Sequence, residues 1–324
     1  MIISRAPFRV SLCGGGSDIP SFYEKYGGCV ISTTIKKYMY IAIHPSFYSD
    51  EIVLKYSVTE RVKNYQDIDH KIYRATLSKM NIKGVEITSM ADIPSGTGLG
   101  SSSAFTVALL LALHTYQNKF IAKYKLACEA CDIEIKDLGN PIGKQDQFAS
   151  AFGGLNYYEF TPSGFVKVEP VVMKPESYAQ LERNLLLFYT GKIHDANKIL
   201  AEQTDNIKKS DGEVKSLIKL TKLTKKLKEE LSKNNIDYVG KILKESWEIK
   251  KELASGISTP FIDKYYEKAL RAGASGGKLL GAGGGGFLLF YAKEEKQAAV
   301  RKALKDLREM KFEFDNSGAS IVHI

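Results

Sequence analysis

The sequence lacks any apolar run long enough to cross a lipid bilayer. Its longest run, around Ala104 to Leu113, falls well short of the roughly 20 residues that a membrane-spanning helix needs. The amino-terminal stretch places Arg5 and Arg9 among its apolar residues and contains no signal-peptide core. We therefore expect a cytoplasmic protein without a membrane partner.

Cysteine is also scarce, since the 324 residues include only Cys13, Cys29, Cys128 and Cys131. So few cysteines exclude a disulfide scaffold in a chain of this length. Cys128 and Cys131 form a C-x-x-C pair within an apolar helical pattern, and no second pair is present to complete a zinc site. We expect buried free thiols, with a redox pair or half of a zinc site as the alternatives.

Acidic residues are outnumbered by basic ones, and the net charge is +9. The lysines are densest at residues 215–233, where they alternate with leucine and isoleucine at helical spacing. This pattern predicts the solvent face of an amphipathic helix, and without a recognisable motif it indicates no nucleic-acid partner. A positive field would also attract an anionic substrate and a nucleotide. Lys192, His194 and Lys198 are interpreted as surface charge rather than as contacts to a phosphate or sugar.

Glycine and serine are concentrated at residues 93–104, which read Ile-Pro-Ser-Gly-Thr-Gly-Leu-Gly-Ser-Ser-Ser-Ala. The surrounding patterns predict a strand at residues 85–90 and a buried helix at residues 104–114. Glycines let the backbone approach a ligand closely, and the free N–H groups at a helix start attract anions. A polyphosphate therefore fits this loop, with a serine hydroxyl left for Mg²⁺. The alternative is a glycine-rich turn followed by a serine N-cap.

Two more glycine-rich stretches follow or precede predicted strands. After a strand at residues 2–12, residues 13–18 read Cys-Gly-Gly-Gly-Ser-Asp. They predict a backbone-lined pocket in which Asp18 accepts hydrogen bonds from substrate hydroxyls, or else a simple turn in which Ser17 or Asp18 caps a helix. The glycines within residues 281–286 stand directly before an apolar strand, which argues against a flexible linker.

Two carboxylates, Glu134 and Asp146, lie on either side of a Gly-Asn-Pro turn. The turn ends one helix, and a second helix is predicted from about Gly143, so the two carboxylates can be brought together. One of them can then hold Mg²⁺ while the other lies beside an attacking hydroxyl. The alternative is a charge on a helix face and an acid that the dipole favours in a first helical turn.

These stretches resemble the motifs of the GHMP kinases, the family of galactokinase, homoserine kinase, mevalonate kinase and phosphomevalonate kinase. Residues 7–18 resemble the first motif, with Arg9 in the place of its basic residue, and residues 94–104 resemble the second. Residues 278–287, which read Lys-Leu-Leu-Gly-Ala-Gly-Gly-Gly-Gly-Phe, resemble the third. The segment from Glu134 to Asp146 is also similar, although its spacing is one residue longer than in mevalonate kinase.

The resemblance implies an α+β fold of two domains. Residues 1–175 would form an amino-terminal ATP-binding domain similar to domain 2 of ribosomal protein S5. Residues 176–324 would form a ferredoxin-like carboxy-terminal domain, with ATP between the two. We place the boundary near residue 175, where prolines and polar residues gather, and we expect the strands within residues 311–324 to complete the carboxy-terminal unit.

The resemblance also implies roles for individual residues. Asp146 would orient or deprotonate the acceptor hydroxyl, Arg9 would steady Asp146, and Ser102 with Glu134 would hold Mg²⁺. The other implied contacts are a triphosphate cradle of Ser95, Gly96, Gly98, Leu99, Gly100, Ser101, Ser102 and Ser103, a sugar site of Gly15, Gly16, Ser17 and Asp18, and a third loop of Gly283, Gly284 and Gly285.

Within the family, the Gly-Gly-x-Ser-Asp form of the first motif resembles most the branch of fucokinase and the heptose phosphate kinases. This resemblance implies a kinase that uses ATP and Mg²⁺ to phosphorylate the anomeric C1 hydroxyl of D-glycero-D-manno-heptose 7-phosphate. The 1,7-bisphosphate product would serve GDP-heptose and surface polysaccharide synthesis. The alternatives are another sugar kinase, such as a fucokinase or galactokinase, and a non-catalytic sensor that binds sugar and ATP.

Overall fold

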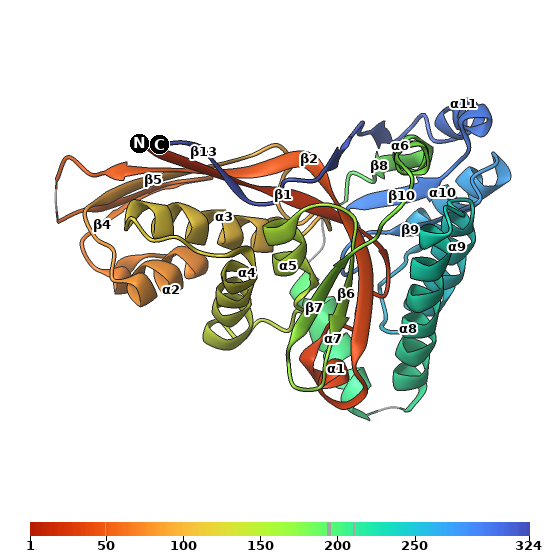
Figure 1. The fold of residues 1–324 in the computed structure, drawn as a ribbon, viewed down its shortest axis with the longest axis horizontal. Helices are drawn as coiled ribbons and strands as arrows, with labels where there is room; N and C mark the ends of the chain where they lie inside the picture. The colour runs from red at the N-terminus through yellow and green to blue at the C-terminus, as the bar shows by residue number, and fades with distance from the viewer. Residues whose placement is uncertain (49, 193–195, 210) are drawn as a thin grey trace.

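The protein folds into two β-sheets with helices packed against them (Figure 1). The computed structural model describes residues 1–48, 50–192, 196–209 and 211–324. His194, interpreted above as surface charge, lies outside these ranges. The mixed α+β architecture with two sheets confirms the expected fold class, while the domain boundary near residue 175 stays a prediction.

The larger sheet has nine strands. Its main path runs in the order β13-β1-β2-β5-β3-β4, while β6 and β12 also pair with β2, and β7 pairs with β6. Only β3 and β5 pair in parallel among the described strands. The strands are β1 (Ile2–Cys13), β2 (Gly28–Pro45), β3 (Ile52–Lys55), β4 (Thr59–Val62), β5 (Val85–Ala91), β6 (Asn156–Phe160), β7 (Val166–Pro170), β12 (Phe314–Asp315) and β13 (Ser320–His323).

The smaller sheet has four strands in the order β11 (Arg308–Glu309), β8 (Leu185–Tyr189), β10 (Phe287–Tyr291) and β9 (Gly276–Leu279). Short 3₁₀ and π turns, η1 (Tyr65–Asp67) and η2 (Asp132–Asp137), accompany the α-helices. The described α-helices are α1 (Pro20–Tyr26), α2 (Lys71–Met80), α3 (Ser101–Tyr116), α4 (Lys123–Cys131), α5 (Gln145–Phe152), α6 (Pro175–Asn184), α7 (Ala196–Lys209), α8 (Asp211–Ser232), α9 (Tyr238–Lys251), α10 (Pro260–Arg271) and α11 (Glu294–Ala303).

The long strands β1 and β2 organise the larger sheet, because both are rich in the β-branched and aromatic residues that suit a pleated surface. β2 pairs with β1 along most of its length, with β6 over residues 28–32 and with β5 over residues 39–45. The glycine turn after β1 and the end of β5 are therefore held on one rigid sheet.

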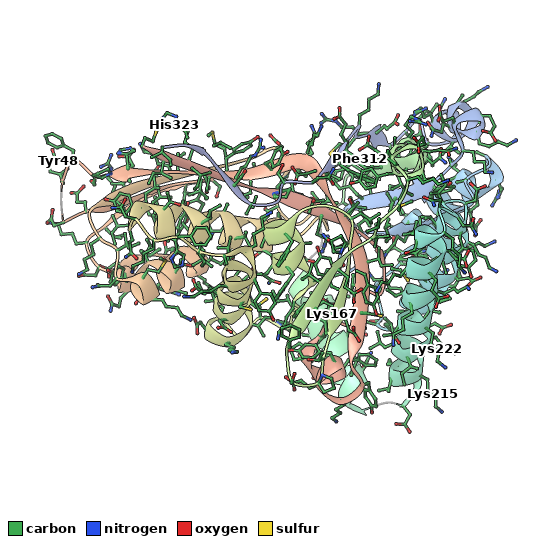
Figure 2. The ribbon with its side chains drawn as sticks, in the orientation of Figure 1. Tyr48, Lys167, Lys215, Lys222, Phe312 and His323 are labelled. Carbon is green, nitrogen blue, oxygen red and sulfur yellow. The ribbon has the colours of Figure 1, made fainter. Side chains whose placement is uncertain are left out.

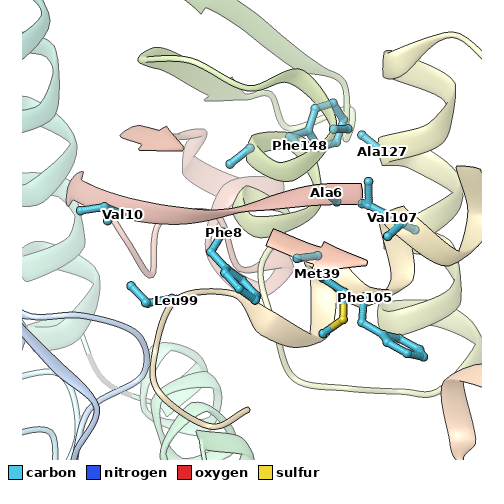
Figure 3. Close-up of a cluster of buried hydrophobic side chains, with 14 of the residues drawn as sticks. Ala6, Phe8, Val10, Met39, Leu99, Phe105, Val107, Ala127 and Phe148 are labelled. Carbon is cyan, nitrogen blue, oxygen red and sulfur yellow. The ribbon is translucent and has the colours of Figure 1, made fainter. Parts of the chain in front are cut away.

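The buried helix predicted after the central glycine loop is confirmed as α3, which packs with α2, α4 and α5 on one face of the larger sheet (Figure 1). Nearly every side chain of α3 between Ala104 and Leu113 is buried. Figure 3 shows Phe105 and Val107 of this helix in the same cluster as Phe8 of β1. Burying each such side chain contributes roughly 1.5–3 kcal/mol, so the first turn of α3 is fixed firmly against the sheet.

The lysine-rich run at residues 215–233 also folds as predicted. Leu217, Leu220 and Leu227 of α8 are buried, while Lys215 and Lys222 are exposed and extend from its outer side (Figure 2). The run is thus the polar face of an amphipathic helix. No helix within the described ranges is both long and apolar enough to cross a membrane.

The four cysteines are free thiols, as expected. Cys13, Cys29 and Cys131 are buried, whereas Cys128 is half-buried. Burial raises the pKa of all four thiols, and protonated thiols are poor nucleophiles and poor metal ligands.

The last strands correct one expectation. Residues 311–324 were predicted to complete the carboxy-terminal unit, but β12 pairs with β2 and β13 pairs with β1 of the larger sheet. The chain thus returns to the strand with which it began, and its two ends lie side by side (Figure 1). One edge of β1 pairs with β2, and its other edge is hydrogen-bonded by β13 from the end of the chain. An unpaired strand edge is unfavourable, which explains why the last strands join the larger sheet.

Candidate active site

A cleft of about 370 Å³ lies where the three glycine-rich loops meet. Residues of the larger sheet and its helices line one part of it, and residues of α7, α9, β9 and the loop before β10 line the other. The lining residues predicted from the sequence are Arg9, Gly15, Gly16, Asp18, Gly96, Gly98, Gly100, Ser101, Ser102, Ser103, Asp146, Gly283 and Gly285.

The central loop presents the open start of α3 to this cleft. Gly96, Gly98 and Gly100 have positive φ values of 73°, 83° and 76°, which glycine adopts without strain. Gly100 occupies the N-cap position, and no side chain caps the helix there. The first backbone N–H groups of α3 are therefore available to an anion, together with the positive end of the helix dipole.

The third glycine loop packs directly on the central loop. A Cβ added at Gly98 would lie 2.5 Å from the carbonyl oxygen of Leu280, and one added at Gly281 would lie 2.4 Å from the Cα of Gly98. A Cβ at Gly286 would lie 2.3 Å from the carbonyl oxygen of Thr97. The glycines of the third loop thus allow two backbones to touch, which fixes the floor of the cleft from both sides.

Arg9 holds Asp146 through a two-pronged ion pair. Its Nε donates to Oδ1 at 2.6 Å and its Nη2 donates to Oδ2 at 2.7 Å. A third donor, Nη1, binds the carbonyl oxygen of Gly98 at 2.6 Å. Arg9 is buried, while the Asp146 side chain keeps 24% of its surface exposed towards the cleft. Bidentate guanidinium–carboxylate pairs are strong and directional, so the carboxylate of Asp146 is held in one orientation.

Glu134 is completely buried behind the start of α3. Its Oε1 accepts from the Ser102 hydroxyl at 2.6 Å, and its Oε2 accepts from Gln147 Nε2 at 2.6 Å. Burial raises the pKa of Glu134 above its usual value, and these hydrogen bonds offset only part of that rise. Glu134 lies in the π-helical turn η2.

Asp18 joins the first glycine turn to the start of α5. Its carboxylate accepts from the backbone N–H of Gly16 at 2.9 Å and of Gln145 at 3.1 Å. A Cβ at Gly143 would lie 1.9 Å from Asp18 Oδ2, so glycine is required for this close approach. Burial and the nearby Asp146 raise the pKa of Asp18. Asp18 therefore positions the turn and α5 in addition to lining the cleft.

Five of the residues predicted to contact ligands do not line the cleft, among them Glu134, which lies behind the start of α3. Ser17 is fully buried, and its hydroxyl donates to the carbonyl oxygen of Gly14 at 2.8 Å, so it supports the turn, while its sugar contact stays a prediction. The Leu99 side chain lies in the hydrophobic core (Figure 3). Ser95 is exposed outside the cleft lining, and Gly284 donates its N–H to Ile257 instead.

Sequence reasoning missed three polar residues that the fold brings to this region. Gln147 orients Glu134, and it follows Asp146 directly in the chain, which was the only signal available. Lys250 of α9 and Lys278 of β9 line the cleft and are almost fully buried. Lys278 stands in the third motif, while nothing in the local pattern distinguishes Lys250.

The residues present fit a nucleotide with Mg²⁺. Mg²⁺ is usually bound by one or two protein oxygens together with substrate phosphates. Glu134 is a buried carboxylate without a cationic partner among the described residues, and Ser102 adds a hydroxyl oxygen beside it. No cluster of three or more metal-ligating side chains occurs in the described ranges.

Two family models, one for each end of the same kinase family, match this chain. Residues 68–154 match the family described as GHMP kinases N terminal domain, and residues 227–308 match GHMP kinases C terminal. A D-glycero-alpha-D-manno-heptose 7-phosphate kinase from Campylobacter jejuni is 31% identical over 320 residues, which cover 94% of this chain and 93% of that protein. A bifunctional fucokinase/GDP-fucose pyrophosphorylase from Arabidopsis thaliana is 28% identical over 95% of this chain but 31% of its own length.

Solved structures give the same architecture. A D-glycero-D-manno-heptose 1-phosphate kinase from Bacteroides thetaiotaomicron has a TM-score of 0.81 and 29% identity, covering 100% of this chain and 99% of that one. A galactokinase from Lactococcus lactis, solved with galactose, has a TM-score of 0.78 at 18% identity, covering 100% of this chain and 95% of that one. At that identity the galactokinase shows the shared fold alone.

Proposed function

Because this chain belongs to the GHMP kinase family, we propose that it phosphorylates the C1 hydroxyl of D-glycero-D-manno-heptose 7-phosphate with ATP. Family membership makes it an ATP-dependent phosphotransferase that acts on a sugar hydroxyl. The observation that carries the chemistry is the fixed Asp146–Arg9 pair beside the open start of α3. The acceptor rests on the similarity to the Campylobacter jejuni kinase over nearly the whole chain.

The nucleotide is proposed to lie with its phosphates against the start of α3. The backbone N–H groups near Gly100 and the hydroxyls of Ser101 and Ser103 would bind phosphate oxygens, with the helix dipole favouring their charge. Mg²⁺, held by Glu134 and Ser102, would neutralise charge on the β- and γ-phosphates. The third glycine loop fixes the central loop, so the central loop would lose little conformational freedom when ATP binds.

Asp146 is proposed to receive the acceptor hydroxyl. Its carboxylate would accept the hydrogen bond of that hydroxyl and either orient its oxygen or take its proton. Arg9 prevents the carboxylate from rotating away and places positive charge near the transferred group. Phosphoryl transfer depends mainly on positioning and on charge neutralisation, and these two residues supply both.

The sugar is proposed to lie between Asp146 and the first glycine turn. Gly15, Gly16 and Asp18 line this part of the cleft. Because the glycines carry no side chains, sugar hydroxyls could form hydrogen bonds directly with the backbone there. The 1,7-bisphosphate would then serve GDP-heptose and surface polysaccharide synthesis. A cytoplasmic location stays part of this prediction.

The test is ATP turnover with Mg²⁺ against D-glycero-D-manno-heptose 7-phosphate, unphosphorylated heptose, mannose 6-phosphate, fucose and galactose. We expect turnover with the heptose phosphate to exceed that with the other sugars, and an acid-labile phosphate at C1 of the product. Preferred turnover of fucose or galactose would overturn the acceptor and leave the mechanism standing. Nucleotide binding without turnover of any sugar would favour a sensor instead.

A further inference from the structure

Two buried lysines line the cleft without a counter-ion of their own. Lys250 is 8% exposed and Lys278 is 3% exposed, yet both belong to the cleft wall. Lys250 donates to the carbonyl oxygen of Gly281. Neither lysine lies within ion-pair distance of a carboxylate in the part of the chain that the structure describes.

The nearby carboxylates are already engaged. Asp146 is bound at both oxygens by Arg9, and Asp18 accepts from backbone N–H groups. Two ammonium groups and one guanidinium thus share one buried region. Burying a cation without a partner is costly, and a structure that accepts this cost has reason to do so where an anionic ligand will supply the missing charge.

The electrostatics of the two lysines agree with this geometry. Burial, Lys278 and Arg9 together lower the pKa of Lys250 to about 7. Burial, with a smaller contribution from Arg9, lowers the pKa of Lys278 to about 8. A bound phosphate would relieve the repulsion between these cations, because opposite charges favour the protonated form of each lysine.

The surroundings place this cationic pair on the acceptor side of the cleft. Besides Lys278 and Arg9, the strongest electrostatic neighbours of Lys250 are Asp18 and Asp146, and Lys278 lies near Cys13, directly before the first glycine turn. In the proposed function, the start of α3 binds the nucleotide phosphates and the Ser102–Glu134 pair binds their Mg²⁺. The two lysines are therefore available to bind a second anion.

Gln203 of α7 supplies an independent sign of a ligand here. It is 2% exposed and lines the cleft, and its Nε2 has no hydrogen-bond partner among the described residues. A Cβ built on Gly16 would lie 2.5 Å from that Nε2, so the amide faces the first glycine turn. Buried donors in native proteins normally have partners, and a polar ligand in the turn would provide one.

We propose that Lys250 and Lys278 form an anion subsite that binds the phosphate group carried by the acceptor sugar. The inference rests on the proposed function, since it explains how the same site selects a phosphorylated sugar over an unphosphorylated one. Gln203 would bind the sugar at the edge of this subsite. The lysines act in binding and take no part in the transfer itself.

The test compares the variants K250M and K278M with wild type in steady-state kinetics. We expect the preference for heptose 7-phosphate over unphosphorylated heptose, measured as the ratio of kcat/KM values, to fall about 10- to 100-fold, as for a lost charge-assisted hydrogen bond. K244M is the matched control, because Lys244 is exposed on the same helix, and it should retain the wild-type preference. An unchanged ratio in both test variants, or a loss confined to the KM for ATP, would overturn the subsite.

A binding measurement separates this proposal from the proposed function. Calorimetry with mannose 6-phosphate and with mannose needs no turnover, and wild type should bind the phosphorylated sugar more tightly while K250M and K278M should lose most of that difference. If wild type turns over fucose best but shows this difference, the proposed acceptor fails and the subsite stands. If wild type turns over heptose 7-phosphate and the variants bind both sugars as wild type does, the subsite alone fails. Thermal unfolding of each variant checks that it is folded.

Discussion

Arg9 holds the carboxylate of Asp146 in one orientation, and Asp146 is the side chain proposed to contact the acceptor hydroxyl. The isosteric variant D146N keeps the volume of the side chain but replaces one accepting oxygen with a donor that faces the guanidinium of Arg9. We expect kcat to fall about 10²- to 10⁴-fold, the range for loss of a positioned proton acceptor. Steady-state kinetics measure this loss, and thermal unfolding confirms that the variant is folded.

The surface variant D306N is a suitable control, since Asp306 is exposed and does not line the cleft. It should retain wild-type turnover. Near-normal turnover in both D146N and R9A would show that the two residues have been given the wrong roles, whatever the acceptor.

At the same scale, the structure shows which residues local sequence cannot identify. Lys250 is buried in the cleft, while Lys244 on the same helix is exposed, and both stand in similar lysine-containing stretches. The two lysines stand six residues apart on α9, so they project from different sides of the helix, and only the fold decides which side meets the cleft. Arg9 and Asp146 were identifiable because each stands in a recognisable motif.

At the scale of elements, two glycine loops from distant parts of the chain form one supporting contact. The variant G98A would introduce a Cβ 2.5 Å from the carbonyl oxygen of Leu280, at a residue with a φ of +83°. We expect the loops to separate, the KM for ATP to rise several-fold and the protein to lose stability beyond the ~1–3 kcal/mol that an unfavourable φ costs alone. Kinetics and chemical denaturation measure these effects.

Gly256 gives a matched control for this variant. Its φ is +76°, and a Cβ there would have no neighbour within 4 Å. G256A should therefore show the cost of the backbone conformation without the clash. Equal effects of G98A and G256A on ATP binding would mean that the contact between the loops does not support the nucleotide site.

Elements with a strong local pattern were predictable, and elements defined by distant partners were not. The apolar run of α3 and the β-branched strand β1 carry their own signals in hydrophobic periodicity and propensity. The strands β12 and β13 are short, and they pair with edges of β2 and β1 that lie more than 270 residues earlier, as Phe314 does with Ile35.

At the scale of the whole molecule, the buried lysines link stability to pH. Between a folded-state pKa of about 7 for Lys250 and an unfolded value near 10.4, the unfolded chain binds more protons than the native one. Stability contributed by this group therefore rises with pH across that window. Lys278, Arg9, Asp18 and Asp146 face Lys250 from the elements packed around it, and all of them remain in the variant K250M.

We accordingly expect K250M to be more stable than wild type at pH 7, on the order of 1–2 kcal/mol, as for other substitutions that trade function for stability. The difference should shrink as the pH approaches 10, because the unfolded chain then also loses the proton of Lys250, as the native protein does from about pH 7. Denaturation of both proteins at pH 6, 7, 8 and 9 measures it. A difference that does not change with pH would show that Lys250 is not desolvated in the native protein.

The return of the chain to its first strand has a consequence for how the protein is made. Nε of Arg5 in β1 donates to the hydroxyl of Ser320, the first residue of β13, a partner 315 residues later. At a synthesis rate of roughly 5–20 residues per second, the ribosome needs on the order of 15–60 s to deliver that partner. During this interval the outer edge of β1 stays open on a growing chain, and open edges recruit other strands. We therefore expect the nascent chain to be most prone to pairing with strands of other chains before its last strands emerge.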